Sequence, residues 1–277
     1  MPGLLCILAH PDDETFCAGL LLALKVKNIP LQLLCVTRGE GGSLGAPALT
    51  TRAELGTVRE KEMRCAAEVF GAQSLAFLDY VDPVGDQGLR TPDHDPETFS
   101  RDLRAAIDSV QPSAVLTHGS GGEYGHPAHR WVHRAVKSVV AAIGEEAPAL
   151  YSFNASHARP GRPKTINYDD PAAFIIDTGM YNAGKVNALT CHATQWMVFV
   201  GAHATMAAYE TPIARFVEAA PREAYCRHWP PNKAIPDDLM ASWLGVKPLS
   251  PRMAHMLSRV RKLTYKITRR LQRYMGQ

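Results

Sequence analysis

The sequence has no C-x-x-C pair, although it contains six cysteines. Two of them, Cys6 and Cys35, lie inside short apolar segments that we predict to be buried strands. This pattern argues against a disulfide framework and favours reduced thiols in a cytosolic protein. We therefore expect reduced cysteines at all six positions: Cys6, Cys17, Cys35, Cys65, Cys191 and Cys226.

The chain also lacks the marks of export and of membrane insertion. Its amino terminus, MPGLLCILAH, has no basic segment, and its apolar run is too short for a signal peptide or a bilayer span. A net charge of only +3 and a pI of about 8.5 argue against nucleic acid as a partner. We therefore expect a cytoplasmic protein.

Strands and helices alternate along the first part of the chain, which has 277 residues, 46% of them hydrophobic. This length suffices for one large α/β domain, or for one domain plus an appendage. Strands are predicted at 4–9, 31–37, 74–78, 114–117 and 149–154, and helices at 15–27, 52–70, 96–110 and 127–143. The alternation predicts βαβ units, and hence a Rossmann-like three-layer sandwich with a mainly parallel sheet.

We divide the chain into a Rossmann-like domain, residues 1–200, and a C-terminal extension, residues 201–277, that packs on it. The extension has no acidic residue after Asp238, and apolar residues recur at helical spacing among lysines and arginines from Arg252 to Tyr274. A basic amphipathic helix of this kind could make a peripheral contact with an anionic membrane. Alternatively, it packs on its own domain or on a neighbouring subunit of a homo-oligomer. We favour the packed helix because the apolar stripe is continuous.

The segment Leu4–Glu14, LLCILAHPDDE, reads as a buried strand that ends in a histidine and three acidic residues. In parallel sheets the chemistry collects beyond the carboxyl ends of the strands. His10 and Asp13 could hold a divalent metal there, and zinc suits this mixture of ligands best. Asp12 would remain as a spare carboxylate able to take a proton from bound water. Capping of the next helix would explain one acidic residue, but neither His10 nor Asp12.

A second cluster, HGSGGEYGHPAHRWVH, follows the predicted strand at 114–117. Pro127 suits the first position of a helix, so His126 falls at the helix start and His129 one turn further on the same face. These histidines could instead be exposed, or could form a structural pair without a metal. The glycines superficially resemble a dinucleotide loop, but their spacing does not match G-x-G-x-x-G. The occurrence of both clusters at strand ends favours a metal site.

Four motifs together resemble the PIG-L/LmbE-like zinc N-deacetylases. They are AHPDDE, EYGHPAH, the R-x-x-E pair Arg59 and Glu62, and the segment CHATQ from Cys191 to Gln195. Members of this family remove acetyl groups from N-acetylglucosaminyl conjugates in mycothiol, bacillithiol and phosphatidylinositol-glycan pathways. The resemblance extends over residues 4–200, so it implies that the first domain is a deacetylase domain.

The resemblance implies a role for each of several residues. Zinc would be held by His10, Asp13 and His129, and Asp12 would be the general base. His126 would polarise or protonate at the tetrahedral intermediate, and Tyr124 would assist at the oxyanion. Arg59 and His192 would contact the substrate, and Arg38, in the glycine-rich loop after the strand at 31–37, is a further candidate. Family members commonly carry Asp where this chain has Ala128, which leaves the protonation state of His126 open.

These features predict a zinc-dependent hydrolase that removes the N-acetyl group from a small GlcNAc-type glycoside by metal-activated water, with Asp12 as general base. Two alternatives stay open. One is an amidase that acts on a thiol conjugate or a chitooligosaccharide, and the other is a non-catalytic sugar- or nucleotide-binding Rossmann module. The sequence does not determine the aglycone, the oligomeric state, or whether zinc, iron or another divalent ion is used.

Overall fold

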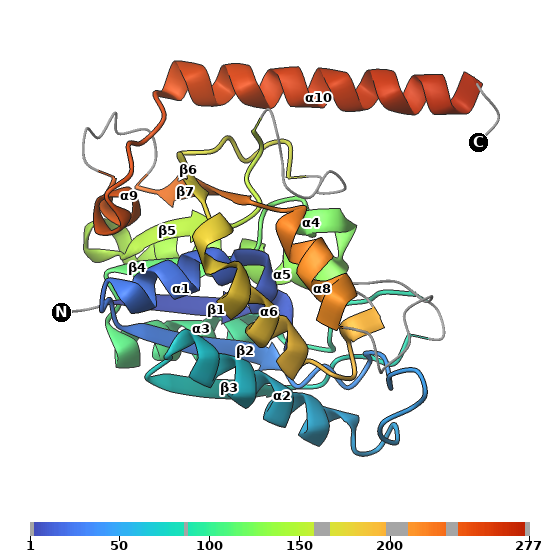
Figure 1. Cartoon of the computed structure of the whole chain (residues 1–277). Coiled ribbons are helices and arrows are strands. Elements are labelled where there is room, and N and C mark those ends of the chain that lie inside the picture. The colour runs from blue at the N-terminus through green and yellow to red at the C-terminus, as the bar shows by residue number, and fades with distance from the viewer. Residues whose placement is uncertain (1–2, 86–87, 158–166, 198–209, 231–237, 275–277) are drawn as a thin grey trace.

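Strands from both halves of the chain form one mixed sheet in the order β3-β2-β1-β4-β5-β7-β6 (Figure 1). The structure is a computed structural model that describes residues 3–85, 88–157, 167–197, 210–230 and 238–274. Neighbours among β1 to β5 pair in parallel, and β7 is antiparallel to both β5 and β6. The strands are β1 (Leu4–Leu8), β2 (Leu31–Thr37), β3 (Ser74–Tyr80), β4 (Ala114–Thr117), β5 (Ala149–Ser152), β6 (Phe174–Asp177) and β7 (Arg222–Trp229).

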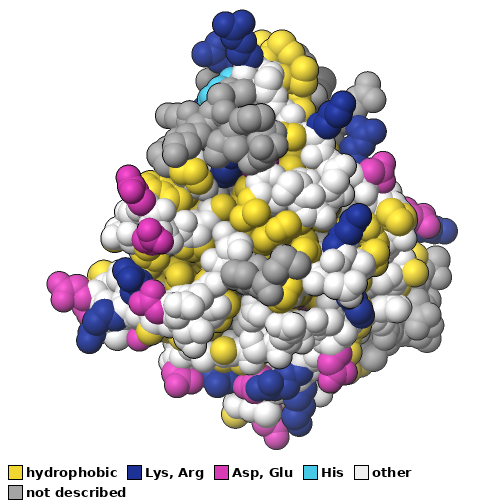
Figure 2. Space-filling model, turned by 90° about the vertical axis from the view of Figure 1, so that its left-hand side faces the viewer, with side chains coloured by type: hydrophobic (Ala, Val, Ile, Leu, Met, Phe, Trp, Pro, Cys, Tyr) yellow, Lys and Arg dark blue, Asp and Glu magenta, His cyan; other side chains and the backbone are white. Residues whose placement is uncertain are grey.

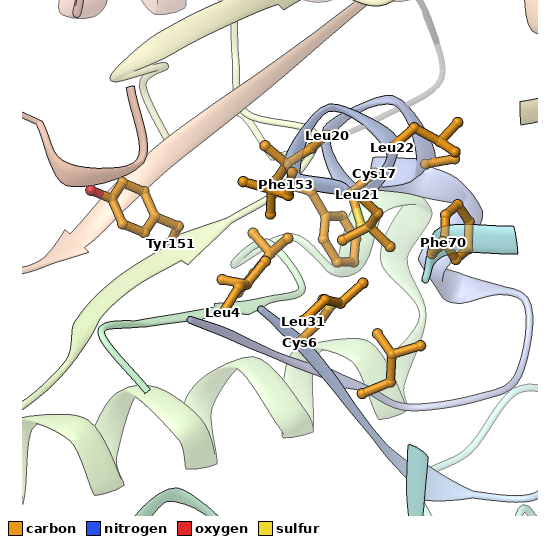
Figure 3. Close-up of a cluster of buried hydrophobic side chains, with 14 of the residues drawn as sticks. Leu4, Cys6, Cys17, Leu20, Leu21, Leu22, Leu31, Phe70, Tyr151 and Phe153 are labelled. Carbon is orange, nitrogen blue, oxygen red and sulfur yellow. The ribbon is translucent and has the colours of Figure 1, made fainter. Parts of the chain in front are cut away.

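Helices cover both faces of this sheet. The central strand β1 is buried along its whole length, and its side chains alternate between the two faces. Leu4 and Cys6 pack in one core with α1, α2 and α6, part of which is drawn in Figure 3, while Leu5 and Ile7 pack in a second core with α3 and α5. The helices are α1 (Ala18–Val26), α2 (Leu55–Phe70), α3 (Pro96–Val110), α4 (Gly122–Gly125), α5 (Pro127–Ile143), α6 (Asn182–Cys191), α8 (Glu210–Glu218), α9 (Leu239–Leu244) and α10 (Pro251–Tyr274).

The predicted Rossmann-like three-layer architecture is therefore confirmed. The bounds of β2, α3, β4 and α5 agree with the prediction to the residue. The helix expected at 15–27 is instead a 3-10 turn, Asp13–Cys17, followed by α1. The two parts are separated because Cys17, with φ −127° and ψ 21°, does not have helical backbone angles.

Strand β7 was not predicted. Its sequence, REAYCRHW, mixes charged and apolar residues, so it has neither a continuous apolar run nor a clean alternation. Nevertheless Ala224, Tyr225 and Cys226 are buried, and the strand lies between β5 and β6. A strand from the segment that we assigned to the C-terminal extension is thus part of the main sheet.

The expectation of six reduced cysteines is wrong for two of them. Cys65 and Cys191 form a disulfide that joins α2 to the end of α6. Their separation of 126 residues gave no signal in the sequence, because the pair forms only where two helices from distant segments pack together. The other four, Cys6, Cys17, Cys35 and Cys226, are free, as expected, and all four are buried.

The last helix, α10, lies across the top of the molecule in Figure 1 and continues beyond the helix and strand layers. It follows the short helix α9, whose first turn is capped by the side chain of Asp238. In the part of the chain that the structure describes, no helix combines the length and apolar character needed to cross a bilayer.

Candidate active site

Both sequence clusters lie at the point where the order of the sheet reverses. β1 pairs with β2 on one side and with β4 on the other. The chain therefore continues from β1 and from β4 towards opposite edges of the sheet. A crevice forms beyond the carboxyl ends of such strands. His10 follows β1 and His118 follows β4, which places the two loops against each other at this edge.

The loop after β1 turns back on itself through Asp13. The backbone N–H of His10 donates to Asp13 Oδ2 at 2.8 Å, and His10 Nδ1 lies 3.3 Å from the same oxygen. On its other side, His10 Nε2 lies 3.3 Å from Asp82 Oδ1, in the loop after β3. Burial lowers the pKa of His10, but the two carboxylates outweigh burial and raise it to about 9. The site therefore favours a positive charge at this position.

The second loop brings two more imidazoles to His10. His126 is the N-cap of α5 and its Nδ1 accepts the N–H of Ala128 at 3.2 Å, while Pro127 begins the helix as predicted. The rings of His126 and His129 stack with centroids 4.4 Å apart. The His10 ring lies 4.8 Å from His126 and 5.3 Å from His129. The two segments thus converge closely enough to share one ion.

Glu123 fixes the orientation of His129 through the ring nitrogen that faces away from Asp13. The Oε2 atom of this buried carboxylate lies 2.7 Å from His129 Nδ1 and 2.9 Å from His118 Nδ1. Because a carboxylate accepts, both imidazoles carry their proton on Nδ1. The neighbouring histidines outweigh the effect of burial and hold the pKa of Glu123 well below its usual range. With Nδ1 bonded to Glu123, the ring directs Nε2 into the site, an arrangement typical of metal-ligating histidines.

Among the residues that the structure describes, two overlapping groups of side chains have ligand atoms close enough to hold a cation. His10, His126 and His129 form one, and Asp13, His118 and His129 form the other, with all ligand atoms of each group within 4.8 Å of one another. His118 is already engaged, since its Nε2 accepts the N–H of Ala9 at 3.0 Å.

Two buried nitrogen atoms in this cluster make no hydrogen bond within the described residues, His10 Nε2 and His129 Nε2. Asp13 bridges the two rings, with Oδ1 3.1 Å from His129 Nε2 and Oδ2 3.3 Å from His10 Nδ1. Buried polar atoms without partners are costly unless something binds them. Imidazole nitrogen and carboxylate oxygen are ligands that zinc accepts, so these residues fit such an ion.

Asp12 lies beside this cluster in an unusual backbone conformation. Its φ of 100° is rare for a residue with a side chain, and the surroundings hold it there. The Asp12 N–H donates to Glu14 Oε2 at 3.0 Å, and Asp12 Oδ1 lies 3.4 Å from an Arg59 nitrogen. Burial and the neighbouring Asp13 raise the pKa of Asp12 to about 6, although Arg59 acts in the opposite direction.

Arg59 is buried and its guanidinium group is largely engaged by backbone. It donates to the carbonyl oxygen of Pro11 and, at 2.8 Å, to that of Gly39. Gly39 has a φ of 70°, and a Cβ at this position would lie 2.0 Å from the guanidinium group. Arg59 thus holds the loops after β1 and β2 together beside Asp12.

The remaining predicted site residues are His192 and Arg38, expected to contact substrate, and Tyr124, expected to assist at the oxyanion. His192 is fully buried and hydrogen-bonds through Nε2 to Glu14, so it lies behind the loop of Asp12. The Arg38 side chain pairs with Glu60 at 2.7 Å and Asp79 at 3.1 Å, away from the histidine cluster. Tyr124 is half-exposed, and its ring centroid lies 5.6 Å from that of His129.

Four residues of the site had no role in the sequence interpretation: Glu14, Asp82, His118 and Glu123. Glu14, His118 and Glu123 lie inside the two quoted motifs, so their position in the motif was an available signal. Asp82 lies beyond β3, and its Oδ2 accepts the N–H of Gly41 at 3.2 Å. Its distance from both motifs in the sequence explains why it was missed.

A cluster of imidazoles and carboxylates at the switch point of a mainly parallel sheet defines a Rossmann-like protein with a candidate metal centre. The model of the PIG-L family, described as GlcNAc-PI de-N-acetylase, matches residues 5–140. A probable N-acetyl-alpha-D-glucosaminyl L-malate deacetylase 2 from Bacillus anthracis is 30% identical over 227 residues, which cover 80% of this chain and 92% of the relative. The chain belongs to the PIG-L family.

Solved structures share the fold at lower sequence identity. N,N'-diacetylchitobiose deacetylase from Pyrococcus horikoshii has a TM-score of 0.60 at 18% identity, over 82% of this chain and 84% of that one. The 4-carboxy-2-hydroxymuconate hydratase GalB from Pseudomonas putida KT2440 has a TM-score of 0.59 at 21% identity, over 85% and 99%. A deacetylase and a hydratase share this fold, so the activity must be argued from the site.

Proposed function

We propose that the chain is a zinc-dependent deacetylase that hydrolyses the N-acetyl group of a small N-acetylglucosaminyl conjugate. The observation that carries the proposal is the convergence of His10, Asp13 and His129 beside the carboxylate of Asp12. Membership of the PIG-L family and similarity to the Bacillus anthracis deacetylase support an N-acetylglucosaminyl amide as the target.

His10, Asp13 and His129 are the residues that would hold the metal. A zinc ion held by these residues would act as a Lewis acid and would lower the pKa of a water molecule bound to it. Glu123 supports this assignment because its bond to His129 Nδ1 leaves Nε2 free to bind. The Ala9 N–H bond to His118 Nε2 argues against His118 as a ligand.

Asp12 would take the proton of the attacking water. With a pKa of about 6, raised by burial, its carboxylate is ionised at neutral pH and remains more basic than an exposed aspartate. The Glu14 and Arg59 contacts keep this carboxylate at the edge of the cluster. Once protonated, Asp12 is the group that donates to the leaving amine.

His126 would act as a neutral hydrogen-bond donor. Burial and the adjacent His10 and His129 lower the pKa of His126 to about 3, and Ala128 supplies no carboxylate to offset them. Its Nδ1 accepts the Ala128 N–H, so the ring proton is on Nε2. That N–H, together with the hydroxyl of Tyr124, would stabilise the developing oxyanion, each donor contributing about 3 kcal/mol.

The test is acetate release from N-acetylglucosaminyl malate, N-acetylglucosaminyl inositol and chitooligosaccharides, with metal content measured on the same preparations. Asp12→Asn should keep its metal and lose about 10²- to 10⁴-fold in kcat, whereas His129→Ala should lose the metal as well. Asp108→Asn, on the exposed face of α3, is the matched control and should change neither. Full activity of Asp12→Asn would exclude the mechanism, and no turnover of any acetylated sugar would exclude the function.

A further inference from the structure

Helix α10 contacts the rest of the protein through residues other than the apolar stripe that its amphipathic sequence suggests. The structure describes its side chains from Arg252 to Leu263, and within this part the buried residues are Ala254, Ser258 and Arg261. Ser258 donates to the carbonyl oxygen of Tyr168 at 2.7 Å, and the Arg261 guanidinium lies 5.6 Å from the centroid of the Tyr168 ring. The helix therefore contacts the body through small and polar groups.

Four large apolar side chains of this part lie on another face and are exposed, whereas Leu257 is half-buried. Their exposed fractions are 49% for Met253, 56% for Met256, 52% for Val260 and 61% for Leu263. The spacing of three, four and three residues places them in one stripe along the helix. In the sequence, Ile267 and Leu271 continue the same spacing. Contiguous exposed apolar surface of this kind marks an interaction site.

Positive charge borders the stripe. Arg252 and Arg259 each precede a stripe residue by one position, about 100° around the helix, and both are exposed. No acidic residue follows Asp238 in the sequence. Figure 2, which looks along α10 from its first residues, shows basic and hydrophobic side chains next to each other at the top of the molecule. Pairing with α10 of a second copy would bring like charges together, whereas an anionic surface complements them.

We infer that α10 docks the protein on an anionic lipid surface. The helix lies in the plane of the interface, with Met253, Met256 and Leu263 among the acyl chains and the arginines at the headgroups. The opposite face of the helix contacts Tyr168 through Ser258 and Arg261. This inference is independent of the proposed deacetylase activity.

Co-sedimentation of the full-length chain with vesicles tests it. Vesicles of phosphatidylcholine alone are compared with an equimolar mixture of phosphatidylcholine and phosphatidylglycerol. The wild-type chain should pellet with the anionic vesicles only, and less at high salt. Met256→Glu with Leu263→Glu should abolish pelleting, and Arg252→Gln with Arg259→Gln should weaken it by at least about tenfold. Met180→Glu, at an apolar residue that is 81% exposed elsewhere, is the matched control and should pellet like the wild type.

The same preparations distinguish lipid binding from the alternatives, no interaction and dimerisation through the stripe. Equal pelleting of the wild-type chain and the Met256→Glu, Leu263→Glu variant would overturn the inference, as would no pelleting with anionic vesicles. If the stripe instead joins two copies, light scattering would give a dimer that the double variant converts to a monomer, without lipid binding. That result would also overturn it. Unfolding curves of the variants verify that they are folded.

Discussion

Glu123 Oε2 lies 2.7 Å from His129 Nδ1, and this bond determines which nitrogen of His129 faces the candidate metal site. The same carboxylate holds His118 at 2.9 Å and accepts the backbone N–H of Gly119 through its other oxygen at 2.8 Å. One buried acidic residue thus orients a proposed ligand and shapes the loop that carries it.

Glu123→Gln should weaken zinc binding by about 10- to 100-fold, because the amide has lost the negative charge that orients His129 and increases its basicity. The measurement is a competition titration of the metal-free protein with a chromogenic chelator. Glu146→Gln, at an exposed residue, is the control. Unchanged affinity in Glu123→Gln would show that His129 does not depend on this bond.

His192→Ala should destabilise the fold by about 3 kcal/mol, because it leaves the buried carboxylate of Glu14 without its partner. It should also lower kcat, since Glu14 accepts the Asp12 N–H. His192→Gln keeps a donor and should recover part of both losses. Urea unfolding and steady-state kinetics measure the two effects. A change in KM alone, with normal stability, would instead indicate direct contact between His192 and the substrate.

Breaking the disulfide should lower the free energy of unfolding by about 4 kcal/mol, because Cys65 and Cys191 close a long loop in the unfolded chain. Urea unfolding of the wild type and of Cys65→Ser without reductant would measure the loss. Thiol titration of the denatured wild-type chain should give four reactive thiols before reduction and six after it. Six before reduction would contradict the pairing.

Acid should destabilise the fold partly through His228. Burial, with the nearby His133 and Lys137, lowers the pKa of His228 from 6.5 to about 3. The unfolded chain therefore takes up a proton near pH 6.5 while the folded chain does not, and stability is lost progressively as the pH falls from there towards 3. Urea unfolding between about pH 7.5 and about pH 5 should show a shallower decline in the free energy of unfolding for His228→Gln than for the wild type. Over this range His228 in the folded wild type stays neutral, because its pKa is about 3. His255→Gln, on the exposed side of α10, should follow the wild type.

Local sequence signals were sufficient for most of the fold and for the convergence of the two motifs at one edge of the sheet. The apolar sequence of β1 and the proline that begins α5 at Pro127 can each be recognised within a short segment. Together, these two features place His10 near His129 once the order of the strands in the sheet is known. Arg59 and His192 were found by motif, but their partners, Gly39 and Glu14, could not be inferred from the motif alone. Their contacts depend on how loops from different strands meet.

Features that arise only from packing were not predictable. The Cys65–Cys191 bond requires α2 and α6 to lie side by side, and β7 is stabilised by two neighbouring strands rather than by its own composition. Asp82 reaches His10 because β3 ends near β1 across the sheet edge. In each case the partner is distant in the sequence, so no periodicity or spacing indicates it.

Strand β7 has a consequence for where the chain can be shortened. Both carboxylate oxygens of Glu223 accept backbone N–H groups at the start of α1, from Gly19 at 2.8 Å and Leu20 at 2.9 Å. A fragment that stopped at residue 200 would strip these acceptors from the helix that follows the Asp12 loop and would uncover the edge of β5. The smallest unit able to keep the site in place must therefore extend at least through Trp229.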